Sequence, residues 1–209
     1  MSTDDRREHL LAIGSQLLGQ QPHGKVSIEE IAEAAGVSKG LLYHYFPTKK
    51  DFILASLARG QKQLGELLTA VPGLPAAMQI RDGLERFLVF VEEHEAAYSA
   101  IFRSRGGGDR EIQAALDQGR EERLEAVVDS MIGWDGAGAP LERTPQLETA
   151  MQGWFFFVEG AVLRWLDRRD LEREQLRQLL ELALLGSLQA AAAIASTQPA
   201  TPDAPAVQP

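Results

Sequence analysis

The fold is decided by the stretch VSIEEIAEAAGVSKGLLYHYFPTKKDF, Val26 to Phe52. Ser27 and Glu30 have the spacing of a capping box, which predicts that a short helix begins there. Gly36 ends its apolar pattern, and Ser38 can cap the next helix. The stretch therefore predicts two short helices joined by a tight glycine turn.

The helix that follows Ser38 is predicted to have one apolar face and one outward face, because helical residues advance by 100°. The outward face combines a glycine, which lets a partner approach closely, with hydroxyl and imidazole donors. Its residues are Gly40, Tyr43 and His44, flanked by Lys39 and Leu41, and they lie opposite Leu42, Tyr45 and Phe46. Such a face can be merely the polar side of a small helix. Combined with the glycine turn, it favours a helix-turn-helix, whose second helix lies in the DNA major groove.

At these residues the sequence resembles the tetracycline-repressor (TetR) family of bacterial regulators. The close match covers about the first quarter of the chain. The resemblance implies an all-α fold, with a helix-turn-helix domain at residues 1–50 and a helical ligand-binding and dimerisation domain at residues 51–195. It also implies a set of DNA contacts: Ser27, Ser38, Lys39, Gly40, Leu41, Tyr43, His44 and Lys49. Leu41 departs from the polar residue often found there, so it either touches a thymine methyl group or contributes no readout.

Composition limits the other possibilities. The chain has 209 residues, a net charge of −9 and no cysteine, which excludes disulfides and thiolate chemistry and fits a reducing cytoplasm. Residues 1–50 are neutral, so the remainder carries the whole negative charge. The scattered histidines suggest no metal site, and we expect no cofactor, no enzymatic activity and no membrane partner. The proline-rich segment at residues 196–209 is expected to be disordered.

The rest of the chain reads as further helices. A helix is predicted before the helix-turn-helix, at residues 4–20, and Thr48 with Asp51 can cap one that extends to about residue 70. That helix would connect the DNA-binding residues to the larger domain. The remaining helices are expected at residues 76–95, around 98–102, and at 112–132, 145–168 and 172–195.

The last two predicted helices are apolar on two faces. A surface helix of a monomer should show one apolar stripe, so the second face needs another partner. We expect a homodimer, and the alternative is that both helices lie centrally within one large bundle. The predicted interface comprises Gly153, Phe156, Gly160, Leu163, Leu182 and Leu185.

A ligand site is predicted within the larger domain. Aromatic side chains accompanied by a few polar groups suit an apolar ligand with one or two directional contacts, although each aromatic could equally be ordinary core. The predicted set is Phe87, Phe90, His94, Tyr98, Phe102, Arg103, Trp154, Phe155 and Val158.

The resulting hypothesis is a dimeric, ligand-responsive transcriptional regulator. Repression of a palindromic operator, relieved by a largely apolar small molecule, is what the resemblance implies. An activator, or a protein that stays bound to DNA without an effector, remains open. The alternative is a helical small-molecule-binding or lipid-binding protein, or an enzyme, in which the N-terminal helices are only structural.

Overall fold

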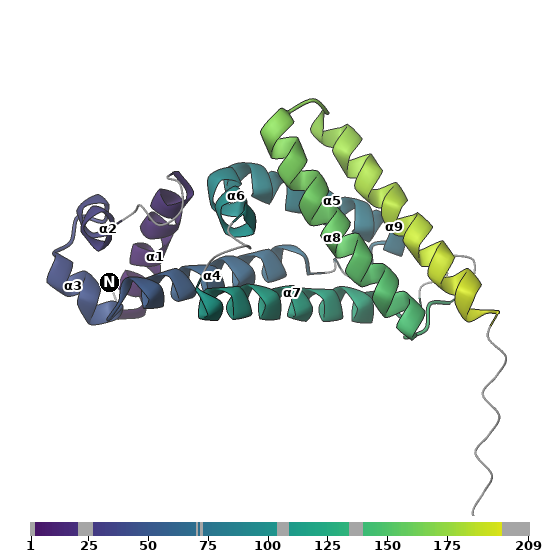
Figure 1. Ribbon diagram of the computed structural model, residues 1–209, viewed down its shortest axis with the longest axis horizontal. Coiled ribbons are helices and arrows are strands. Elements are labelled where there is room, and N and C mark those ends of the chain that lie inside the picture. The colour runs from purple at the N-terminus through teal and green to yellow at the C-terminus, as the bar shows by residue number, and fades with distance from the viewer. Residues whose placement is uncertain are drawn as a thin grey trace, which may run out of the picture.

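The computed structural model describes residues 3–20, 27–69, 71, 73–103, 109–133 and 140–197. In these ranges the chain forms helices and no strand, so the all-α prediction is confirmed (Figure 1). From residue 198 the predicted disordered tail lies outside the described residues. The helices are α1 (Thr3–Gln20), α2 (Ile28–Ala34), α3 (Lys39–Tyr45), α4 (Lys49–Leu67), α5 (Ala76–Glu93), α6 (Glu95–Arg103), α7 (Arg110–Met131), α8 (Pro145–Arg168) and α9 (Arg173–Ala195).

The helix boundaries around the DNA-binding stretch follow the predicted caps. The Ser27 hydroxyl accepts a hydrogen bond from the Glu30 amide, and the Glu30 carboxylate accepts one from the Ser27 amide, which completes the capping box of α2. Ser38 caps α3 by accepting from the Leu41 amide at 3.2 Å. Gly36 has φ +64°, a left-handed conformation that glycine adopts without steric cost, and this lets the chain turn from α2 into α3.

Helices α1 to α3 and the start of α4 enclose a small core of their own. The rings of Phe46 and Phe52 meet edge to face with centroids 5.0 Å apart. Phe52 packs directly on α1, because a Cβ atom at Gly14 would lie only 1.9 Å from the Cζ atom of its ring. This core therefore reaches past residue 50 into α4. Its buried members are Leu10, Leu11, Ile28, Ile31, Ala32, Leu42, Phe46 and Phe52.

A second core lies within the bundle of α5 to α9, and α8 supplies many of its residues. Met151 and Val162 of α8 are fully buried. The indole of Trp154 donates to the carbonyl of Leu180 at 3.0 Å, so this buried nitrogen has a partner. The bond ties α8 to α9, which lie side by side in Figure 1.

Helix α4 joins the two cores, and it runs beside α7 (Figure 1). Near its start, the ammonium of Lys50 lies 2.6 Å from the carboxylate of Glu111, at the start of α7. Further along, the side-chain amide of Gln61 donates to the carbonyl of Ala115 at 2.9 Å. These contacts attach the helix that follows α3 to the larger domain.

The middle and the far end of α4 have different neighbours. Arg59 pairs with Glu8 of α1 at 3.1 Å, within the N-terminal part of the structure. Arg86 of α5 donates to the carbonyl of Leu67 and, at 3.5 Å, to that of Thr69. A guanidinium at this position satisfies carbonyl groups that a helix end leaves without intrahelical partners.

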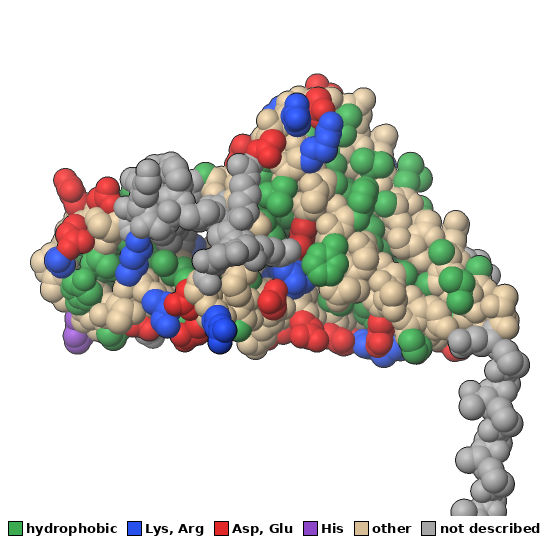
Figure 2. All heavy atoms as spheres, in the orientation of Figure 1, with side chains coloured by type: hydrophobic (Ala, Val, Ile, Leu, Met, Phe, Trp, Pro, Cys, Tyr) green, Lys and Arg blue, Asp and Glu red, His purple; other side chains and the backbone are tan. Residues whose placement is uncertain are grey.

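The outer face of α8 and α9 is apolar and exposed. Figure 2 shows hydrophobic side chains spread over these two helices. Phe156 is 49% exposed and Leu182 is 67% exposed, while Gly153 and Gly160 are also exposed. Within a single chain this face is therefore uncovered, and the alternative that both helices lie centrally within one bundle is wrong.

Among the described helices, α9 is long and apolar enough to cross a membrane by length and composition. Its stripe of Leu176, Leu180 and Leu184 is buried in the second core. Packing on one side and the exposed apolar face on the other account for this hydropathy.

Candidate DNA-binding face and ligand site

The outward face of α3 is accessible, as the helical spacing predicted. Tyr43 is 40% exposed, and Lys39, Gly40 and His44 are exposed beside it. Leu42, on the opposite side, is fully buried. Of the remaining predicted DNA contacts, Ser38 is exposed, and Ser27, Leu41 and Lys49 are half-buried. The predicted α3 residues thus share an accessible face, and Ser27 and Lys49 are partly accessible, while the DNA contacts of all of them stay a prediction.

Lys39 has an intramolecular partner on this face. Its ammonium pairs with the carboxylate of Glu29 on α2, and it lies 5.7 Å from the centroid of the Tyr43 ring. The hydrogen bond from Lys39 holds the pKa of Glu29 below its usual value, and the same bond raises the pKa of Lys39. Both side chains are solvent-exposed, so screening by salt weakens their attraction.

The hydroxyl groups of Ser27 and Ser38 are engaged in capping. Ser27 donates its amide to the Glu30 carboxylate at 2.6 Å and its hydroxyl to the same oxygen at 2.9 Å. A phosphate at this position would have to compete with Glu30 for these two donors.

The predicted ligand residues that the structure describes gather on α5, α6 and α8. Tyr98 is buried, and its ring centroid lies 6.2 Å from that of Phe87 and 4.4 Å from that of Phe102. Trp154 and Phe155 meet edge to face at 5.5 Å. Val158 is buried, as is Trp154. These rings pack against the second core, and their role in binding a ligand stays a prediction.

The predicted polar partners of those rings are placed differently. His94 is exposed, its ring stacks on Phe90 with centroids 4.2 Å apart, and its Nδ1 atom lies 2.8 Å from the Phe90 carbonyl oxygen. The Arg103 side chain lies outside the described part of the structure.

A buried ion pair lies between α7 and α8. Arg120 and Glu159 are 9% and 8% exposed, and Nε of Arg120 donates to Oε1 of Glu159 at 3.0 Å. Sequence reasoning assigned no role to either residue. The signal was a lone carboxylate inside the apolar run at residues 151–166, because a buried carboxylate requires a cationic partner.

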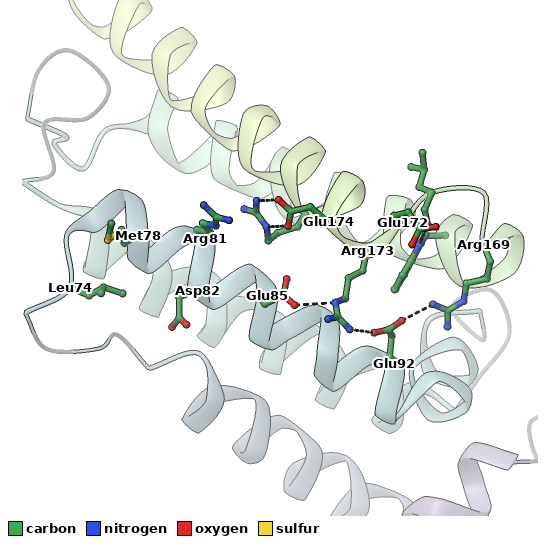
Figure 3. Close-up of a pocket in the computed structure, with 13 residues that line it drawn as sticks. Leu74, Met78, Arg81, Asp82, Glu85, Glu92, Arg169, Glu172, Arg173 and Glu174 are labelled. Carbon is green, nitrogen blue, oxygen red and sulfur yellow. Dashed lines mark hydrogen bonds and ion pairs between the residues drawn. The ribbon is translucent and has the colours of Figure 1, made fainter.

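A charged groove of about 890 Å³ lies between α5 and the start of α9 (Figure 3). Arg173 bridges Glu85 at 3.0 Å and Glu92 at 2.7 Å, and Arg169 reaches Glu92 from the end of α8 at 3.1 Å. The charged groups in the groove therefore largely pair with one another. Across the described ranges, no group of three or more His, Cys, Asp or Glu could hold a metal ion. The lining residues are Leu74, Met78, Arg81, Asp82, Glu85, Glu92, Trp165, Arg169, Leu171, Glu172, Arg173, Glu174 and Arg177.

One ion pair at the edge of this groove perturbs a carboxylate strongly. Hydrogen bonds from Arg177 and Gln178 lower the pKa of Glu174 to about 2. Arg177 is 3% exposed, and its pKa is raised chiefly by the hydrogen bond to Glu174. The contact helps to fix the first turn of α9.

The capped two-helix unit, its exposed donor-rich face and the larger helical bundle define a two-domain helix-turn-helix protein. Comparison with known proteins assigns it more closely. Residues 10–56 match the family "Bacterial regulatory proteins, tetR family", and residues 77–186 match "Tetracyclin repressor-like, C-terminal domain". The chain belongs to the TetR family of bacterial regulatory proteins.

Curated relatives match only part of the chain. The transcriptional activator FasR of Mycolicibacterium smegmatis is 29% identical over 134 residues, which are 60% of this chain and 58% of that protein. The transcriptional repressor NemR of Escherichia coli K12 is 41% identical over 73 residues, or 33% of this chain and 37% of that protein. The chain thus spans about a third to three-fifths of the length of these relatives.

The structural likeness extends along nearly the whole chain. A TetR-family transcriptional regulator from Streptomyces coelicolor has a TM-score of 0.80 and 28% identity, and the likeness covers 93% of this chain and 85% of that chain. The fatty acid degradation regulator FadR from Bacillus halodurans has a TM-score of 0.72 at 12% identity, over 88% of this chain and 97% of that chain, which shows the fold alone.

Proposed function

We propose that the protein is a homodimeric transcriptional repressor that binds a palindromic operator and is released from it by a small, largely apolar effector. The observation that carries this proposal is the outward face of α3, where Lys39, Gly40, Tyr43 and His44 are exposed beside a capped helix start. A DNA partner implies a cytoplasmic protein in a bacterium.

The charge distribution supports DNA binding by one end of the molecule. Residues 1–50 are neutral, whereas the remainder carries the net charge of −9. An acidic body is repelled by phosphate, so it orients the neutral end, with Lys39 and Lys49, toward the duplex. Phosphate contacts set the position of the protein, and base contacts near the start of α3 would specify the sequence.

The exposed apolar face of α8 and α9 supports a homodimer. Phe156 is 49% exposed and Leu182 is 67% exposed. Large apolar side chains that are exposed together on one face indicate a protein–protein interface. A Cβ atom added at Gly153 or Gly160 would meet no other atom within 4 Å, so there is room for the helix of a second copy to approach closely. A two-fold dimer presents two α3 helices to the half-sites of a palindrome.

The direction of regulation is part of the proposal. The named relatives include both an activator, FasR, and a repressor, NemR. A repressor requires only that the dimer occupies its operator and that the effector prefers the DNA-free conformation.

The decisive experiment is selection of bound duplexes from a random DNA pool by the purified protein. We expect enrichment of a palindrome with half-sites about one helical turn, or roughly 34 Å, apart. Affinity should fall steeply with salt, because phosphate binding releases counterions. Absence of any enriched sequence, together with turnover or tight binding of a metabolite, would favour the alternative of a ligand-binding protein or enzyme.

A second experiment tests the effector. Apolar compounds are screened by quenching of the fluorescence of Trp134, Trp154 and Trp165, and each hit is titrated against the protein–operator complex. Linkage requires that an effector which weakens DNA binding is itself bound more weakly by the DNA complex, by the same factor. A compound that binds the dimer and its DNA complex with equal affinity is not an inducer.

A further inference from the structure

Two buried nitrogen atoms on α7 lack hydrogen-bond partners among the described residues. They are Nη2 of Arg120 and Nε2 of Gln113. Buried donors are almost always paired with protein groups, ordered water or a ligand, because an unpaired one forfeits its hydration. A guanidinium can only donate, so the partner that Nη2 of Arg120 requires is an acceptor.

The two donors lie on one side of α7. They are seven residues, or two helical turns, apart, which corresponds to about 10 Å along the helix axis. Leu116 lies between them in sequence and is buried as well. An elongated molecule parallel to α7 would therefore meet both donors.

The aromatic residues of the predicted ligand site adjoin this stripe. Phe155 lies one turn before Glu159 on α8, and residues at this spacing are neighbours on a helix surface. Glu159 in turn bonds Arg120 at 3.0 Å. The Arg120 guanidinium also lies 5.2 Å from the centroid of the Phe156 ring. Arg120 therefore lies against the stretch of α8 that carries Phe155, Phe156 and Glu159.

The charges around Arg120 decide which acceptor is suitable. Glu159 already neutralises the guanidinium, and Asp117 adds a second carboxylate at 3.1 Å from Nη1. A carboxylate or phosphate placed here would be an additional negative charge without a counterion, which is costly in a buried site. A neutral oxygen accepts a hydrogen bond without that cost.

We propose that Gln113 and Arg120 bind a neutral hydrogen-bond acceptor, such as the carbonyl oxygen of a ketone, ester or amide, on an elongated apolar effector. The inference builds on the proposed function, since it names the chemical class of the effector. It excludes fatty acids and phosphorylated lipids as the preferred ligands of this site.

The first test uses the protein without ligand. Gln113→Leu replaces the unpaired amide by an apolar side chain of similar size, so we expect the Tm to rise by roughly 2–8 °C. The matched control is Gln118→Leu on the same helix, where the amide is exposed and donates to Glu122 at 2.9 Å. We expect the control to change Tm by less than about 2 °C. A lower Tm for Gln113→Leu would contradict the assignment of an unpaired amide.

The second test compares probes of equal chain length by quenching of Trp154 and Trp165 fluorescence, without DNA. The probes are methyl decanoate, decanoate and decylamine. We expect methyl decanoate to bind at least about tenfold more tightly than the other two, because only it brings a neutral acceptor without a charge. Equal or tighter binding of decanoate would overturn the proposal, and so would failure of all three probes to bind.

The variants connect the two tests. Gln113→Leu should weaken methyl decanoate binding by roughly 2- to 12-fold while it raises Tm, and Gln118→Leu should leave binding unchanged. The double variant Arg120→Met/Glu159→Leu removes both charges, which is often tolerated in a core, and should weaken the same probe comparably. Raised stability with unchanged probe affinity would mean that water alone occupies the site. DNA binding by these variants is measured separately, so loss of operator binding would count against the proposed function and not against this site.

Discussion

The ammonium of Lys39, in the first turn of α3, pairs with the carboxylate of Glu29 on α2. Lys39 is one of the residues expected to meet DNA, so Glu29 competes with the nucleic acid for it. The carboxylate also places a negative charge on the side of the molecule that would approach phosphates.

Replacement of Glu29 by Gln should therefore tighten DNA binding. We expect an increase in affinity of roughly 3- to 10-fold at low salt that shrinks as salt screens the charge. The control is Glu33→Gln on the same helix, which removes an equal charge from an exposed position without altering the Lys39 partner. Fluorescence anisotropy with the selected duplex measures both variants. An equal gain in the two variants would show that net charge alone is responsible.

Phosphate contacts and base readout should be separable by mutation among the predicted DNA-binding residues. Tyr43→Ala and Lys49→Ala are expected to weaken binding to all duplexes about uniformly, and Lys49→Ala should lower the salt slope by roughly one. Leu41→Ala should instead change base preference, because an apolar side chain discriminates through the thymine methyl group. Affinities for a panel of single-substitution operators distinguish these outcomes. Unchanged affinity in both Tyr43→Ala and Lys49→Ala, with the fold intact by circular dichroism, would refute the predicted face.

The dimer interface can be tested without disturbing the fold of the single chain. A Cβ atom added at Gly160, on the exposed side of α8, meets no neighbouring group within 4 Å in the single chain, so Gly160→Leu is expected to clash chiefly with a second copy. We expect it to sediment as a monomer at micromolar concentration and to lose tight operator binding. Gly65→Leu, at an exposed helical position that is equally open, is the control and should remain dimeric. A parent protein that is monomeric would defeat the prediction outright.

Stability of the N-terminal core depends on the close approach of Phe52 to α1. An alanine at Gly14 would place its Cβ atom 1.9 Å from the ring, and the ring is fully buried. Gly14→Ala should lower the free energy of unfolding by about 1–3 kcal/mol through overpacking. Gly65→Ala, in an open helical position, should raise it by about 0.5–1 kcal/mol. Urea denaturation measures both variants. If Gly14→Ala is as stable as the parent or more stable, the Phe52 ring can move aside and the prediction is wrong.

Acidic pH should lower the free energy of unfolding through protonation of Glu174. Its pKa is about 2 in the folded chain, against an ordinary value of 4.5. A lowered folded pKa stabilises the protein above the unfolded pKa, and this contribution disappears as the pH falls from about 4.5 to about 2. Glu174→Gln should be less stable than the parent at pH 7 and should lose less stability across that window. Thermal unfolding as a function of pH measures this, with Glu93→Gln on the exposed side of α5 as the control for loss of charge. Parallel pH curves for the parent and Glu174→Gln would disprove the role.

Local signals in the sequence predicted the helices well, because their ends depend on nearby residues. Ser27, Ser38 and Thr48 each cap the helix predicted to follow, and Pro145 opens α8 after its cap Thr144. The buried face of α3 also followed from spacing alone, since α3 is short and one side is strongly apolar.

Contacts between distant residues were not predictable in this way. Lys39 and Glu29 meet only because the turn at Gly36 brings α2 and α3 together, and Arg120 meets Glu159 across two helices. Burial along α9 also depends on its neighbours, because Leu180 is fully buried whereas the adjacent Leu179 is 45% exposed. It lies at the border of the stripe, where the position of the neighbouring helix decides burial.

The attachment of α4 at several points along its length has a mechanical consequence. A helix of 19 residues is about 28 Å long, so a tilt of about 5° about one end moves the other by roughly 2.5 Å. Arg86 holds the far end at Leu67, and Lys50 is tied to Glu111 near the start. If a shift in the bundle tilts this helix, α3 is expected to move with it, and in the proposed two-fold dimer the separation of the two α3 helices would change by up to twice that displacement.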